Sequence, residues 1–91
     1  MEILKHGQPI SLQLSDYLKE FTTPEDIANV STETGVSIST LNYVKRRANN
    51  VSEGNEKGII LLARKAYANA EYRRKFAMKA KKELKTLVES I

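Results

Sequence analysis

The last third of the chain carries an uninterrupted heptad pattern, and this pattern restricts the possible folds more than any other feature. From Ile59 onward, small and apolar side chains recur at alternating steps of four and three residues, with one charged exception at Arg73. The seam consists of Ile59, Ala63, Ala66, Ala70, Arg73, Ala77, Ala80, Leu84, Leu87 and Ile91. This spacing is typical of a helix that packs along one stripe. Because no proline or glycine follows Gly58, the pattern predicts one helix of roughly 35 residues, about 50 Å long.

Such a helix is longer than the core that the rest of a 91-residue chain can build around it. We therefore expect its far half to pair with a second copy, making a homodimer. The residues predicted to pair are Ala70, Ala77, Ala80, Leu84, Leu87 and Ile91. Two alternatives stay open. The helix can fold back as a hairpin at Asn69-Ala70, and its basic flank, from Arg73 to Lys85, can bind phosphates, RNA or an anionic membrane instead of solvating a coiled coil.

The composition argues against most catalytic and metal-binding classes. There is no cysteine, and His6 is the single histidine, so thiolate and histidine metal sites, Ser-His triads and cysteine nucleophiles are not expected. We predict no enzyme activity, no catalytic or metal-binding residue, no cofactor and no small-molecule ligand. No apolar run approaches the roughly 18 residues needed to span a bilayer, so a membrane location is not expected. A cytoplasmic location is predicted, in a bacterium or in the host of a phage.

The charge is strongly divided along the chain. The net charge is +4, but residues 1–44 sum to −4 and residues 45–91 to +8. A basic half of this kind suggests an anionic partner such as nucleic acid. The alternative is a solvated helix surface.

Three shorter helices are predicted before the long one. Residues 11–21 place apolar side chains at helical spacing. Thr23 and Pro24 are typical of a helix start, and Gly35 is typical of a helix end. Ser37 then caps a helix predicted over 38–48, with Leu41, Val44 and Ala48 buried, and Ser52 is the predicted cap of the long helix. The fold class is therefore all-α: a helix-turn-helix bundle of three short helices plus a long C-terminal helix.

The stretch EDIANVSTETGVSISTLNYVKRRANNVSEGNEKGIILLA, residues 25–63, carries a family resemblance. Within it, TGVSISTLNYV is similar to the turn and recognition helix of lac repressor headpieces and lambda Cro-like repressors, and NNVSEGNEKGIILLA is similar to the segment that follows. The chain departs from the family at Ser31, where alanine is usual, and at Thr34, where an apolar residue is usual. The resemblance implies that the helix beginning at Ser37 enters the major groove of DNA.

Carried over position by position, the resemblance gives a set of DNA-binding residues. The base-reading residues that it implies are Ser37, Ile38, Ser39, Asn42, Tyr43 and Arg46. The chemistry of the neighbouring side chains adds Thr40, Lys45, Arg47 and Asn50 to the predicted DNA-binding set. Asn42 is suited to adenine and Arg46 to guanine or a phosphate, while Lys45, Arg47 and Asn50 are expected near the sugar-phosphate backbone.

Several of these positions have a structural alternative. Ile38 can pack on the preceding helix, Thr40 can bond within its own helix, Tyr43 can stack on the N-terminal helix, and the basic run 45–47 can be a solvated helix end.

The sequence thus predicts an irregular N-terminal arm (1–10), a helix-turn-helix DNA-binding domain (11–68) and a C-terminal dimerisation helix (69–91). The predicted function is sequence-specific binding of double-stranded DNA by a small dimeric transcriptional regulator, a repressor of bacterial or phage type. One alternative is a phage or plasmid assembly protein, similar to a terminase small subunit or a partition component. Another is a protein-interaction adaptor.

Overall fold

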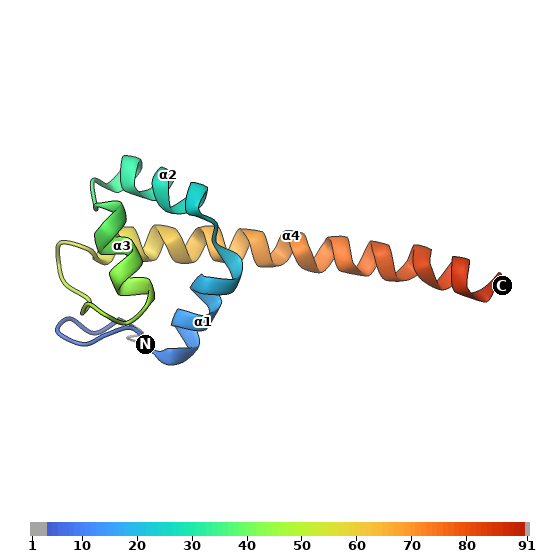
Figure 1. Ribbon diagram of the computed structural model, residues 1–91, viewed down its shortest axis with the longest axis horizontal. Coiled ribbons are helices and arrows are strands. Elements are labelled where there is room, and N and C mark those ends of the chain that lie inside the picture. Colours follow the sequence, from blue (N-terminus) through green and yellow to red (C-terminus); the bar gives the residue numbers. More distant parts are fainter. Residues whose placement is uncertain (1–3, 91) are drawn as a thin grey trace.

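The computed structural model describes residues 4–90, which form four helices and no strand. The helices are α1 (Leu12–Phe21), α2 (Pro24–Thr34), α3 (Ile38–Lys45) and α4 (Glu56–Glu89). Figure 1 shows α1, α2 and α3 gathered around the first half of α4, whose second half extends away alone. The predicted all-α class, three short helices plus a long C-terminal one, is confirmed. Ile91, the last residue of the predicted dimerisation set, lies outside the described residues, as do residues 1–3 of the predicted arm.

Each short helix begins at a hydroxyl side chain that accepts a backbone N–H bond. Ser11 caps α1 through the amide of Leu14, at 3.0 Å. Thr23 caps α2 and accepts from the Asp26 amide at 3.1 Å, while the Asp26 carboxylate accepts from the Thr23 amide. Caps of this kind stabilise a helix by about 1 kcal/mol each. The predicted starts at Thr23 and Ser37 are confirmed.

A single apolar core joins all four helices and three segments outside the helices. Its buried members are Ile10, Leu18, Ile27, Val30, Val36, Leu41, Val44, Val51, Ile59, Leu62 and Ala66. Because α4 supplies its buried side chains only from its first half, the core ends where α4 leaves the other helices.

The N-terminal segment is irregular, as predicted, but it is attached to the body. The Gly7 amide donates to the Val51 carbonyl and the Val51 amide donates to the Gln8 carbonyl, both at 2.8 Å. Ile10 is 1% exposed and belongs to the core. His6 contacts the carboxylate of Glu56, at the start of α4, at 2.8 Å.

The predicted end of the third helix at Ala48 is wrong: α3 ends at Lys45 and Ala48 is exposed. Arg47 adopts a left-handed φ of 64°. Its amide donates to the Val44 carbonyl, and the Ala48 amide donates to the Tyr43 carbonyl. This is the bonding of a Schellman motif, in which glycine usually takes the left-handed position.

The predicted cap of the long helix at Ser52 is also wrong, because a turn over residues 53–55 separates Ser52 from the first helical residue, Glu56. The Ser52 hydroxyl accepts from the Asn55 amide at 3.3 Å. Asn55 is buried, and its side chain accepts from the Ser52 amide at 2.8 Å and donates to the Asn50 carbonyl at 3.0 Å. Asn55 therefore orders the loop before α4.

The long helix is continuous, so the hairpin alternative at Asn69-Ala70 is wrong. Instead of breaking the helix, the Asn69 side-chain amide donates to the Phe21 carbonyl at 2.8 Å and to the Asp26 carboxylate at 3.0 Å. One turn later, the Arg73 guanidinium lies over the Phe21 ring, 4.9 Å from its centroid. Arg73, the one charged residue of the heptad seam, thus lies where α4 leaves the body.

The projecting half of α4 makes the molecule elongated. Its extents are 57 × 26 × 21 Å and its radius of gyration is 16.7 Å, whereas a compact domain of this length has about 12 Å.

Candidate nucleic-acid interface

The inner face of α3 holds this short helix firmly on the body. Leu41 and Val44 are each 1% exposed, and the Ser15 hydroxyl of α1 donates to the Lys45 carbonyl at 2.6 Å. At Gly58 of α4, a Cβ atom would lie 2.9 Å from Leu41 Cδ2. The absence of a side chain at Gly58 therefore allows α3 to approach α4 closely.

The outer face of α3 gathers several of the predicted DNA-binding residues. Ile38 and Tyr43 are both 48% exposed. Ser37 and Ser39 are exposed at the N-terminal end of the helix, and Asn42 is half-buried. Polar and apolar groups suited to base edges thus share the surface that the fold leaves open.

Two basic residues extend this surface at the end of α3. The guanidinium of Arg46 lies over the ring of Tyr43, 5.0 Å from its centroid, an arrangement that favours a defined position for both side chains. Lys45 is half-buried in the last turn of the same helix. Positive charge and an aromatic ring therefore lie together at this end of α3.

Part of the predicted set also has a role in the fold. Ile38 lines a small cavity of about 120 Å³ with Pro24 and Ile27 of α2. The Thr40 hydroxyl accepts a hydrogen bond from Ser37 at 2.8 Å. Ile38 is therefore partly covered by α2 and partly exposed. The Thr40 hydroxyl is bonded to Ser37, the residue that caps its own helix.

Arg47 and Asn50, the two residues after α3 that are predicted to lie near the DNA backbone, form hydrogen bonds within the protein. Arg47 donates from Nε to the Ile10 carbonyl at 2.7 Å, which ties the N-terminal segment to the end of α3. Asn50 is exposed, and its carbonyl accepts from Asn55. The sequence did not indicate either contact. Arg47 and Ile10 lie far apart in the chain, and the bond between Asn50 and Asn55 depends on the conformation of the loop.

The first turn of α2 carries a carboxylate with a perturbed pKa. Partial burial alone raises the pKa of Asp26, but hydrogen bonds from Thr23 and Asn69 and the charge of Lys65 outweigh it, so the pKa lies below the ordinary value. Charge and hydrogen bonding thus hold Asp26 ionised where α2 meets α4.

The predicted dimerisation residues fall into two groups. Ala70 is half-buried and lies near α1, whereas the others described project beyond the body on the free half of α4. Of these, Leu84 and Leu87 are 57% and 60% exposed. Both leucines are therefore available to a partner.

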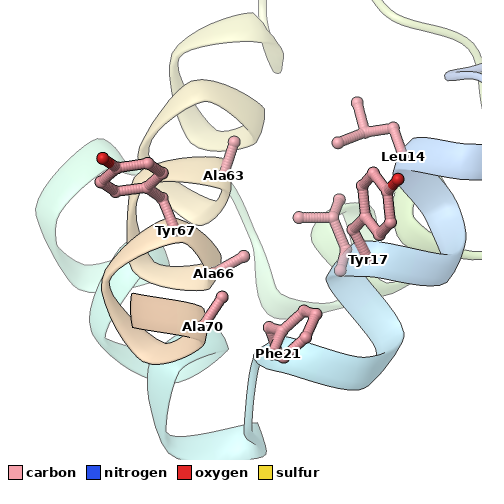
Figure 2. A pocket seen from close by; sticks show the side chains of 8 residues that line it. Leu14, Tyr17, Phe21, Ala63, Ala66, Tyr67 and Ala70 are labelled. Atoms are coloured by element: carbon pink, nitrogen blue, oxygen red, sulfur yellow. The ribbon is translucent and has the colours of Figure 1, made fainter. Parts of the chain in front are cut away.

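An apolar groove lies beside the predicted dimerisation residues, and the sequence did not predict this groove. It has a volume of about 310 Å³ and runs between α1 and α4. Figure 2 shows Ala63, Ala66 and Ala70 of α4 facing α1, which supplies Leu14, Tyr17 and Phe21. The helical spacing of the apolar residues in α1 was visible in the sequence, but the distance between the two helices was not.

Within residues 4–90, no helix combines the length and the apolar character that crossing a bilayer requires. The same residues contain no group of three or more histidine, cysteine, aspartate or glutamate side chains placed to hold a metal ion. Comparison of the chain with protein-family models, curated proteins and solved structures finds no match.

Proposed function

We propose that the protein binds double-stranded DNA sequence-specifically as a small dimeric transcriptional regulator, with α3 in the major groove. The observation that carries the proposal is the division of α3 into two faces. Leu41 and Val44 anchor one face in the core, while Ile38 and Tyr43 remain half exposed on the other. A short, rigidly held helix with an open polar face has the form needed to read base edges.

The residues of the open face have chemistry that matches bases. The Asn42 side-chain amide can donate to and accept from adenine, and the Arg46 guanidinium can pair with guanine or a phosphate. Ile38 can contact a thymine methyl group. Contacts to phosphates would come from Lys45, whose charge lies at the end of the same helix.

Dimerisation would give the protein two such helices. We propose that the exposed leucines of the free half of α4 form the contact between two copies. A two-fold dimer presents two recognition helices to two half-sites, so the bound sequence should be palindromic.

Selection from a random duplex pool at low and at near-physiological salt tests this function. We expect binding that weakens as salt rises and that enriches a palindromic sequence. Binding without enrichment would contradict sequence reading, and no binding at either salt would contradict DNA binding altogether and favour the adaptor alternative.

A second function is favoured by the charge of the free half of α4. Residues 73–90 carry seven basic and two acidic side chains, a balance of +5. A phage or plasmid assembly protein that coats DNA would use such a surface for contacts to phosphates without reading sequence. Light scattering separates the two functions, because the regulator is expected to be a dimer and an assembly protein a larger multimer.

A further inference from the structure

The groove between α1 and α4 continues along α4 toward its N-terminal end. A second cavity, of about 410 Å³, shares Leu14, Ala63 and Tyr67 with the first and reaches Ile60. Tyr67 is 76% exposed and Ile60 42% exposed. A continuous apolar surface on a body of this size is a candidate for helix binding.

The residues of the heptad seam alternate in spacing between four and three, and this series of spacings is the same from either end of the helix. Two α4 helices that run antiparallel can therefore align their seams between positions 63 and 87, whereas Ile59, which is 1% exposed, stays in the core of its own copy. In that alignment Ala63 lies opposite Leu87, Ala66 opposite Leu84, and Ala70 opposite Ala80. The small side chains line the groove, and the large ones come from the free half, so each leucine meets an alanine.

We propose that the groove between α1 and α4 receives the free half of α4 from a second copy of the chain, in an antiparallel and reciprocal dimer. Each copy then fills the groove of the other. This inference specifies the dimer contact of the proposed function, but it does not depend on DNA binding.

Charge favours the antiparallel direction over the parallel one. The free half of α4, residues 73–90, has a balance of +5, whereas α1 and α2 together carry five acidic side chains and one basic one. Residues 4–72 as a whole carry eight acidic and eight basic side chains, so antiparallel pairing places the basic half of one copy against a body without net charge. Parallel pairing would instead align two basic halves, which repel each other.

Cysteine cross-linking tests the direction, because the natural chain has no cysteine. We would prepare Ala63→Cys and Leu87→Cys as separate proteins and oxidise them alone and mixed. Each protein carries one cysteine, so every disulfide joins two copies. Positions 63 and 87 lie about 36 Å apart along one helix, so they can come together only when the two helices run antiparallel. We expect the mixture to yield a disulfide-linked heterodimer, while Leu87→Cys alone stays unlinked. Efficient linking of Leu87→Cys alone would show parallel pairing and overturn the proposal.

Sedimentation without DNA tests the contact itself. We expect Leu84→Lys with Leu87→Lys to weaken self-association at least tenfold, and Met78→Lys, an exposed position off the seam, to leave it unchanged. Both variants keep the core intact because these side chains are exposed, and circular dichroism checks the fold. A wild-type monomer at 100 μM would overturn the proposal. Loss of DNA binding with an intact dimer would contradict only the proposed function.

Discussion

At Gly35 the backbone adopts a φ of 77°, and this conformation sets the angle between α2 and α3. Apart from the two neighbouring residues, no atom lies within 4 Å of the position that a Cβ would take, so backbone strain is the main obstacle to a side chain there. We expect Gly35→Val to lower the free energy of unfolding by about 1–3 kcal/mol. Urea denaturation measures the loss. Gly54→Ala, which meets only the Ser52 hydroxyl at 3.8 Å, serves as the control; equal stability of both variants would contradict this role of Gly35.

Gly58 is required for a different reason, which is space. A Cβ there would lie 2.9 Å from Leu41 Cδ2 and 3.0 Å from Val36 Cγ2. We expect Gly58→Ala to cost about 1–3 kcal/mol through overpacking, reduced by up to about 1 kcal/mol because alanine favours a helix. A lower melting temperature than that of the wild type is the expected result, and a higher one would show that the neighbours yield easily.

These two glycines also show which residue roles a sequence reveals. Gly35 is recognisable because a turn between Thr34 and Ser37 needs a left-handed residue, which is a local property. The requirement at Gly58 comes from side chains of α3 and its preceding turn, far away in the chain, and nothing near Gly58 indicates it.

At the scale of elements, Asp26 and Asn69 join α2 to α4. Asp26 has a lowered pKa in the folded protein, so the folded state holds its proton less tightly than the unfolded chain. The resulting stability is present above the ordinary value of 3.8 and is lost as pH falls through the lower folded pKa.

We therefore expect the wild-type protein to lose stability as the pH falls below this ordinary value, and Asp26→Asn to lose less over the same range. The pKa of Glu71 is also lowered, by its hydrogen bond from Arg74, and this adds a pH dependence of the same sign. The slope of stability against pH is therefore smaller in Asp26→Asn than in the wild type, but it does not vanish. Thermal unfolding at several pH values measures it, with Asp16→Asn as the control. An unchanged slope in Asp26→Asn would contradict the role of Asp26.

The helix ends that the sequence predicted correctly are those with a local signal. Thr23, Pro24 and Ser37 mark helix starts through their own side chains or ring. The end of α3 was missed because Arg47, not a glycine, takes the left-handed conformation, and its bond to the Ile10 carbonyl connects distant segments. The start of α4 was missed because Asn55 acts through a loop rather than as a simple cap.

For the whole molecule, the sequence predicted the length of α4 but not the groove beside it. The length follows from an unbroken heptad pattern. The groove depends on how far α1 lies from α4, which is set by packing among all four helices. The open face of α3 was predicted by resemblance and is exposed in the structure, but its contact with DNA remains a proposal.

The most direct test of that proposal compares base discrimination by three proteins: the wild type, Asn42→Ala, and Asn29→Ala as a control on the exposed side of α2. Each would be titrated with the selected duplex and with duplexes altered at one base pair. We predict that Asn42→Ala weakens binding to the selected duplex roughly 5- to 150-fold and no longer distinguishes the base pair it reads, whereas Asn29→Ala retains both affinity and discrimination. Full discrimination by Asn42→Ala at every position would contradict sequence reading by this face of α3.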